Sequence, residues 1–431
     1  MKKHILFSFV FGILSLLSSG IYALPRFALM RGDANCLSCH VNPTGGELRG
    51  PGGVSYAIND LPMWKRGDSI KYTGEISPGL RLGGDFRSQV LMFSQTSPLY
   101  NTPTDSGAKL TKIGDTTKRI TSFHAMSLAF EINVKATNTL SGFFRYDPLG
   151  ITPTEGWTLL QFVHSTGEIF QSGDVVTNAY VKIGAFLPAF GIRFDDHTTY
   201  IRGGNASEST GQAGFQAEGF FWSPGYRDVG AEIGTTLFDH ISFQGGVFNG
   251  SETAPYANFN PTGNKAICMR LTGTNEFIED VLDAEIGGSY YLHNHATEGD
   301  SPNLSDIAVH LGLRVGPVTI LSEYDMGKNI NVGGTTMPKV SALCIESTLG
   351  VTKGLDFMVR YETFKDENPI GVVNTEVNGR IVIGAQWFPL RFVEIRPEYR
   401  IAMTSAQNQT NSSIMDDFTE NTMLIQTHVF F

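Results

Sequence analysis

The sequence predicts an all-β fold, a transmembrane antiparallel β-barrel of about 16 strands, with a small segment in front of it. Three observations support this. Charged residues make up only 17% of the 431 residues, whereas Gly and Phe number 48 and 30. Apolar and polar residues alternate with a period of two from about Pro78 to the C-terminus, which is typical of half-buried strands. Long polar connections also alternate with short turns, as they do in outer-membrane barrels.

Residues 1–23 have the pattern of a secretory signal peptide. Lys2 and Lys3 supply the basic start, Ile5 to Leu17 the apolar run, and small residues lead to a cleavage site after Ala23. A retained anchor is the alternative, but the apolar run is shorter than the roughly 20 residues that a membrane-spanning helix needs. We therefore expect an exported chain without a helical anchor.

Residues 24–77 surround the motif Cys36-Leu37-Ser38-Cys39-His40. C-x-x-C-H is the attachment signature of a c-type haem. Cys36 and Cys39 would form the thioethers, and His40 would be the proximal iron ligand. The alternatives are a disulfide or half of a zinc site. Zinc would need a second ligand pair at similar spacing, and Cys268 and Cys344 are isolated. The sequence therefore predicts one covalent haem c.

This segment is too small to bury much core of its own. It is rich in Pro and Gly, which favour loops with one or two helical turns. We expect it to lean on the haem, on the barrel, or on both, and so to plug or cap residues 78–431.

The barrel strands show two clearly different faces. Leu80, Leu82, Phe86, Val90 and Met92 alternate with Arg81, Asp85, Arg87 and Gln89. Short turns are predicted at 137–138, 187–189, 238–240, 316–317, 352–354 and 388–390. Long loops are predicted near 96–118, 148–172, 203–224, 250–263, 294–304, 327–338, 367–378 and 405–420. Both termini then fall on the short-turn, periplasmic side. A soluble β-sandwich or propeller would not explain the outward apolar faces.

Alternation also predicts the direction of each candidate distal haem ligand. His124 should face lipid with Met126 and Leu128, whereas His310 and His428 should face the lumen. His428 lies nearest the expected haem position, and His310 is second.

Methionine ligation is the other possibility for the distal site. Met63 and Met30 in the haem segment, or lumen-facing Met358, would give His/Met ligation. A five-coordinate or water-ligated iron also stays open. His293 and His295 share a face near the end of their strand, and Asp300 follows in the loop. These residues form either an extracellular metal-binding patch or an ordinary polar rim.

The lumen faces carry charges of both signs. Basic residues there would neutralise haem propionates, select anions, or form ladders with carboxylates along the wall. The predicted lumen charges are Arg81, Arg87, Arg145, Lys182, Arg193, Arg270, Arg314, Arg360, Arg396 and Arg400, with Asp85, Glu131, Asp195, Glu232, Glu285, Glu323, Glu346, Glu362 and Glu398. The formal net charge of −10 gives no basic footprint for nucleic acid.

The segment Pro25-Arg26-Phe27-Ala28, followed by Cys36 to Gly46 and then a barrel, resembles the fused monohaem porin–cytochromes. In that family an N-terminal c-type haem plugs or caps an outer-membrane barrel, and members from iron-oxidising bacteria are held to take electrons from extracellular Fe(II). The stretch Ala179 to Arg193 is similar to a hairpin of phosphate-selective-type porins, and Val247-Phe248-Asn249-Gly250 fits the same pattern.

The sequence and this resemblance favour an outer-membrane electron-transfer protein with one haem c. It would connect an extracellular donor or acceptor, such as Fe(II), with a periplasmic soluble cytochrome or other redox carrier. The alternative is a passive or gated solute porin whose haem segment is a structural plug. A haem enzyme is a third possibility, but no hydrolytic or transferase site is apparent. Partners would include outer-membrane lipid and, as in many porins, two further copies in a homotrimer.

Overall fold

The computed structural model describes residues 29, 36–64, 72–100, 112–149, 154–164, 176–192, 199–202, 227–238, 240–250, 265–278, 281–293, 303–332, 335–367, 375–407 and 415–431. The signal peptide, Met30, Arg193, Asp195, His295 and Asp300 lie outside these residues. Among the described residues, no helix is long and apolar enough to cross a bilayer.

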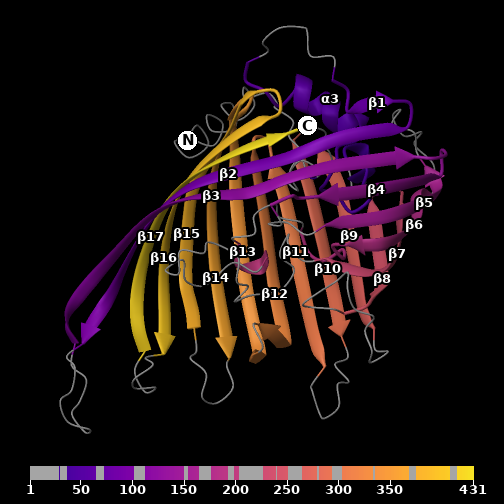
Figure 1. Ribbon diagram of the computed structural model, residues 1–431. Helices are drawn as coiled ribbons and strands as arrows, with labels where there is room; N and C mark the ends of the chain where they lie inside the picture. The colour runs from indigo at the N-terminus through magenta and orange to yellow at the C-terminus, as the bar shows by residue number, and fades with distance from the viewer. Residues whose placement is uncertain are drawn as a thin grey trace, which may run out of the picture.

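Sixteen antiparallel strands, β2 to β17, close into a barrel because the last strand pairs with the first (Figure 1). A short strand, β1 (Glu75–Ser77), pairs with the start of β2. The barrel strands are β2 (Leu80–Tyr100), β3 (Lys112–Lys135), β4 (Leu140–Tyr146), β5 (Glu155–His164), β6 (Val176–Phe186), β7 (Asp228–Leu237), β8 (Ile241–Phe248), β9 (Ala266–Ile278), β10 (Leu282–His293), β11 (Leu304–Val315), β12 (Val318–Val332), β13 (Thr335–Thr352), β14 (Leu355–Glu367), β15 (Thr375–Leu390), β16 (Val393–Gln407) and β17 (Met415–Phe430). The predicted barrel and strand number are confirmed.

The two faces of the wall differ as the alternation predicted. Outward residues are large, apolar and exposed, as at Phe123, Ile286 and Phe357. Inward residues include many buried charged groups, such as Arg360 and Glu362 on β14. An exposed apolar belt around a closed barrel is the surface that lipid covers.

The two ends of the barrel have different connections. At one end, where β17 finishes, tight turns join the strands except between β5 and β6, which are separated by residues 165–175; we call it the short-turn end. The opposite end carries most of the longer connections, and we call it the long-loop end. The turn predicted at 388–390 lies at 391–392, since β15 runs to Leu390 and β16 begins at Val393. The loop predicted at 327–338 is mostly strand, because β12 ends at Val332 and β13 begins at Thr335.

The largest correction concerns residues 187–189, which are not a tight turn. They begin the connection from β6 to β7, and its described parts fold into the lumen. The wall is low here, since β4 and β8 have only 7 and 8 residues, compared with 21 and 24 in β2 and β3. The loop predicted at 148–172 is also wrong in its centre, where β5 is a strand.

The prediction that His124 faces lipid is wrong. The register of β2 with β3 shifts between Arg87 and Ser88, so Met126 is an extra residue in β3. A bulge of this kind reverses the alternation along the bulged strand. Phe123 is therefore 80% exposed on the outside, and His124 lies on the inward face with a buried Nε2.

Gly234 on β7 should be intolerant of a side chain. A Cβ there would lie 2.3 Å from Tyr180 ring atoms, whereas at Gly142 on β4 it would meet only a carbonyl oxygen at 4.0 Å. We expect Gly234→Ala to lower the free energy of unfolding by about 1–3 kcal/mol. Gly142→Ala should be neutral or raise it by about 0.5 kcal/mol. Urea unfolding in detergent measures both, and equal effects would contradict the packing.

Candidate functional site

The C-x-x-C-H motif forms a single helical turn, η1 (Cys36–Ser38) with the two residues after it. The Cys36 carbonyl accepts hydrogen bonds from the backbone N–H groups of Cys39, at 3.2 Å, and His40, at 2.9 Å. In a helical turn, side chains at i, i+3 and i+4 share one face. The turn therefore brings the two thiols together on one side with His40 directly after them, and the thiols are half-buried and not joined in a disulfide. This arrangement fits covalent haem attachment.

Glycines allow the following helix, α3 (Pro51–Asn59), to pack directly on the motif. An added Cβ at Gly52 would lie 2.1 Å from the Ser38 carbonyl oxygen, and one at Gly53 would lie 2.2 Å from that of Cys39. The Gly50 N–H also donates to the Cys39 carbonyl at 2.8 Å. Residues 36–61, which we call the plug, are thus one folded unit.

The turn Asn42-Pro43-Thr44-Gly45-Gly46 is built around the Asn42 amide. Its Oδ1 accepts from the Thr44 N–H at 3.2 Å and from the Thr44 hydroxyl at 3.0 Å. Its Nδ2 donates to the Gly45 carbonyl at 3.1 Å and to Glu47 Oε1 at 2.9 Å. Gly45 has φ +80° and lies beside Cys36 Sγ. Asn42 therefore fixes the turn against the thiol face.

A buried lysine of the barrel wall holds this turn. Lys182 on β6 is 0% exposed and donates to Asn42 Oδ1 and Thr44 Oγ1, both at 3.3 Å. Its ion pair with Glu232 on β7, at 2.9 Å, neutralises the charge. Glu47 adds a second link by accepting from Trp157 Nε1 at 3.3 Å. The plug thus lies inside the lumen against β5 to β7.

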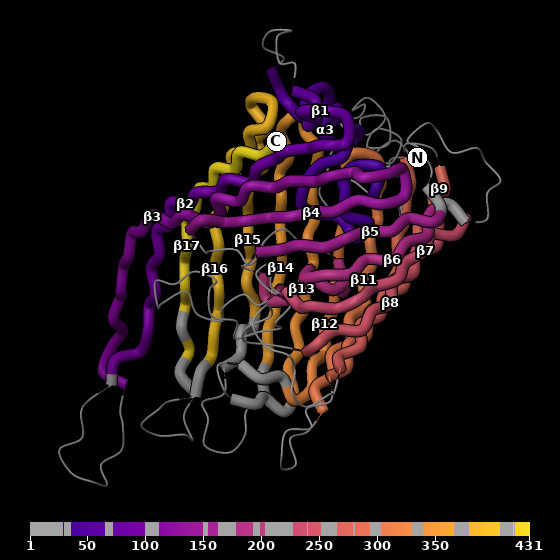
Figure 2. Tube along the Cα trace, turned by 45° about the vertical axis from the view of Figure 1, so that its right-hand side comes forward, coloured from indigo at the N-terminus to yellow at the C-terminus, as the bar shows by residue number. Residues whose placement is uncertain are grey.

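The rest of the plug fills the short-turn end of the barrel, where Figures 1 and 2 show α3 above the ring of strands. Its apolar side chains pack on aromatic residues of the strand ends, and the Arg49 guanidinium stacks over the Phe430 ring at 4.0 Å. This apolar cluster comprises Val54, Tyr56, Ala57, Leu61, Phe388, Phe392 and Phe430. Cations at the rim cap the carbonyls of α3: Lys353 bonds to Asn59 and Arg391 to Ile58.

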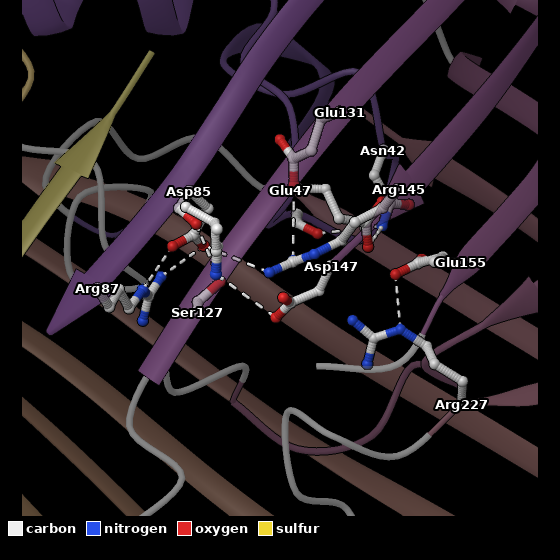
Figure 3. Close-up of polar contacts among 12 residues, drawn as sticks. Asn42, Glu47, Asp85, Arg87, Ser127, Glu131, Arg145, Asp147, Glu155 and Arg227 are labelled. Carbon is white, nitrogen blue, oxygen red and sulfur yellow. Dashed lines mark hydrogen bonds and ion pairs between the residues drawn. The ribbon is translucent and has the colours of Figure 1, made fainter. Parts of the chain in front are cut away.

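Charged wall residues surround the plug (Figure 3). Arg145 on β4 pairs with Glu131 at 3.5 Å and Asp85 at 3.6 Å, and the figure shows Asn42 and Glu47 beside it. Arg87 pairs with Asp85 at 2.8 Å. These groups neutralise one another, so the wall beside the plug at β2 to β4 carries ion pairs.

Of the predicted histidine ligands, His428 is the one whose contacts lead to the plug. It faces inward near the end of β17, and its ring lies 4.9 Å from that of Phe430, on which Arg49 stacks. Nδ1 is 3.1 Å from Glu394 Oε2 and Nε2 is 3.3 Å from Asp85 Oδ1. Both nitrogens therefore already face carboxylates.

The other predicted ligands lie apart from that position. His310 faces the lumen on β11, with Nε2 at 3.4 Å from Glu285 Oε1 and 3.5 Å from Thr272 Oγ1. Met63 lies at the rim, where its N–H donates to the Phe388 carbonyl at 2.8 Å. Met358 is buried on β14. His293 is buried against Gly250, and the described residues contain no group of metal-ligating side chains that could hold an ion.

A second obstruction crosses the lumen further toward the long-loop end. It consists of residues 187–192 and the 3-10 turn η2 (Tyr200–Arg202), which we call the inserted segment. The Gly191 N–H donates to Ser289 Oγ at 2.8 Å, and the Tyr200 N–H to Glu362 Oε1 at 3.2 Å. Arg380 stacks over the Tyr200 ring at 3.9 Å. The segment therefore contacts the wall from β10 to β15.

Arg202 is the charged centre of the inserted segment. Its Nη2 is 2.6 Å from Glu323 Oε1, and Nη1 is 3.5 Å from Asp325 Oδ2. The Ile192 N–H donates to the same Glu323 carboxylate. Arg202 and its partners are buried, and a buried guanidinium is stable only when it is paired in this way.

The remaining lumen charges form ladders along the wall. Arg360 and Arg380 share Glu362, at 3.1 and 2.7 Å. Arg396 and Arg400 share Glu398, each at 2.7 Å. Of the three roles considered for these basic residues, the structure supports a cohesive ladder.

Sequence reasoning missed the roles of three residues, Lys182, Asn42 and Arg202. Lys182 was counted only as one lumen charge, and Asn42 only as part of a motif; no local pattern shows that they meet across 140 residues. Arg202 lay in a stretch expected to precede a long loop. For Asn42, the signal was the Asn-Pro-Thr-Gly sequence itself, which is typical of a side-chain-stabilised turn.

Replacing Lys182 should weaken both the wall and the plug. Lys182→Met leaves the buried Glu232 carboxylate without a cation, although the Tyr180 hydroxyl still donates to it, so we expect a loss of about 3–5 kcal/mol in the free energy of unfolding. The double variant Lys182→Met/Glu232→Gln removes the orphaned charge and should recover part of that loss. Urea unfolding measures this, and a double variant less stable than the single one would contradict the pairing.

No family model matches this sequence, and no curated protein does. Solved structures with a similar course of the chain include OmpT of Vibrio cholerae, 10% identical over 82% of this chain and 97% of that chain, with a TM-score of 0.46. The channel DcaP of Acinetobacter baumannii is 13% identical over 82% and 98%, with a TM-score of 0.46. An anion-selective porin from Comamonas acidovorans is 9% identical over 82% and 99%, with a TM-score of 0.45. None of these similarities bears on the activity of this chain.

Proposed function

We propose that this chain is a porin-type barrel of the bacterial outer membrane whose short-turn mouth is closed by the plug, and that the plug carries one covalent haem c. The observation that carries the proposal is the attachment of the C-x-x-C-H unit to the lumen wall through Lys182, Asn42 and Thr44. A segment that only tethered a haem outside the barrel would not need a buried lysine inside it.

The orientation follows from the ends of the barrel. Short turns face the periplasm in outer-membrane barrels, and longer loops face outward. The plug is therefore proposed to lie at the periplasmic mouth, where the exported chain would meet the haem attachment machinery before the barrel closes.

The chain's own residues would position the haem. Cys36 and Cys39 would hold it, His40 would bind its iron on one side, and α3 packs behind the motif through Gly52 and Gly53. When bound, such a haem supplies one-electron transfer. His428, His310 and Met63 stay candidates for the other side, and His428 would have to leave at least one of its two carboxylate partners.

Electron transfer is the second candidate function, and the placement of the thiol face inside the mouth favours it. Distance limits this function. The apolar band of such a barrel is about 25 Å tall, so a haem at the periplasmic end is too far from a donor that stays outside the barrel. A small donor such as Fe(II) would have to enter the lumen past the inserted segment. A soluble periplasmic cytochrome could then meet the exposed side of the plug.

Removing the plug should open the pore. We expect deletion of residues 36–61 to raise single-channel conductance in planar bilayers severalfold, because the inserted segment is then the main obstruction among the described residues. The matched control is Asn59→Ala, which removes only an exposed side chain of α3. Equal conductance of the deletion variant and the intact protein would contradict the plug.

Anaerobic Fe(II) separates the two candidate functions. Protein from a host that matures c-type cytochromes should show a c-type visible spectrum, and Cys36→Ala/Cys39→Ala should abolish it while the barrel still folds. If the chain conducts electrons from iron, Fe(II) added at the long-loop side of proteoliposomes should reduce the haem. A c-type spectrum that Fe(II) leaves oxidised would count against iron oxidation and leave the plugged porin.

A further inference from the structure

The plug does not end inside the barrel but continues over its rim. After Leu61, the chain follows the end of β15, where the Met63 N–H donates to the Phe388 carbonyl at 2.8 Å and the Trp64 N–H to the Pro389 carbonyl at 3.2 Å. We call residues 62–64 the strap. It connects the lumen side of the wall with the outer side.

Trp64 lies on the outer surface of the wall. Its ring packs edge-on against Trp387, with centroids 5.7 Å apart and planes at 86°. Trp387 faces outward, since its neighbours Gln386 and Phe388 are buried, and its cross-strand partners are Leu355 and Ile395. Trp64 is nevertheless 52% exposed, so Trp387 covers only part of it.

The surface around this pair is continuous with the lipid-facing belt. Leu349, Phe357 and Leu390 on β13 to β15 are exposed apolar residues of the same face. Trp387 is three residues from the end of β15, which places it about 10 Å from the short-turn rim at the strand rise per residue. This is the level at which tryptophan concentrates in membrane proteins, because its ring is apolar and its N–H is polar.

We propose that Trp64 is a lipid anchor of the strap, inserted with Trp387 into the headgroup and carbonyl region of the leaflet at the short-turn end. The partner is the lipid surface itself, and the anchor comes from the plug's own chain rather than from a barrel strand. The C-terminal end of the plug is then fixed at two places: at the rim by the Lys353 and Arg391 caps on α3, and on the outer side of the wall by lipid. The plug cannot withdraw unless Trp64 leaves the membrane interface.

Tryptophan fluorescence in vesicles with lipids brominated near the carbonyl region tests this on the intact protein. Trp64 and Trp387 are the tryptophans that the described residues place on the outer surface, whereas Trp157 is buried in the lumen. We expect Trp64→Phe to lower the quenched amplitude by about half. Trp157→Phe is the matched control: it removes the hydrogen bond to Glu47 but no tryptophan of the outer surface, so the quenched amplitude should stay unchanged. Trp222 is retained in every variant.

The inference is overturned if Trp64→Phe leaves bromolipid quenching intact and instead removes quenching by aqueous iodide. Trp387→Phe separates this failure from a failure of the proposed function. If neither Trp64→Phe nor Trp387→Phe changes bromolipid quenching, the barrel itself does not lie in the bilayer at the proposed level. The readout does not depend on haem or on conductance.

Discussion

The arrangement of the lumen depends on the buried ammonium group of Lys182. An ammonium has three protons to donate and is costly to bury unless all of them find acceptors. Glu232 takes one and cancels the charge, while Asn42 and Thr44 take the others. Because two of the three acceptors belong to the plug, the wall around Lys182 is satisfied only when the plug is in place. The same contacts fix the turn that lies against Cys36.

Both lumen obstructions are held by a buried cation. The cation comes from the wall in one case and from the segment in the other. In the plug, the wall supplies the cation and the segment supplies neutral acceptors. In the inserted segment, Arg202 supplies the cation and the wall supplies Glu323 and Asp325. Both leave each buried charge with an opposite partner, which is the condition for charged groups to persist at low dielectric. In both cases, charged groups of the wall have their partners in the segment that lies in the lumen.

Much of the barrel could be predicted because one side of every strand faces lipid. That constraint writes a period of two into the sequence, and it placed Arg87, His310 and His428 on the inward face. The prediction from alternation failed where a single extra residue breaks the period. Met126, two residues after His124, is such a residue, and the bulge has no local signature in the sequence. The prediction of a tight turn at 187–189 also failed. This Pro-containing stretch has the composition of a turn but enters the lumen. The prediction of haem attachment rests on the C-x-x-C-H spacing alone, whereas the contact of Asn42 with Lys182 depends on the closure of the barrel and has no local signature.

The C-x-x-C-H unit is proposed to be a haem-bearing plug. The most direct measurement is the intact mass of the mature protein, purified from the outer membrane of a host that makes c-type cytochromes, with peptide mapping of the modified site. We expect the mass of the polypeptide plus one haem, located on the peptide that contains Cys36 and Cys39. A bare polypeptide mass, from a host shown to mature another c-type cytochrome in parallel, would contradict it.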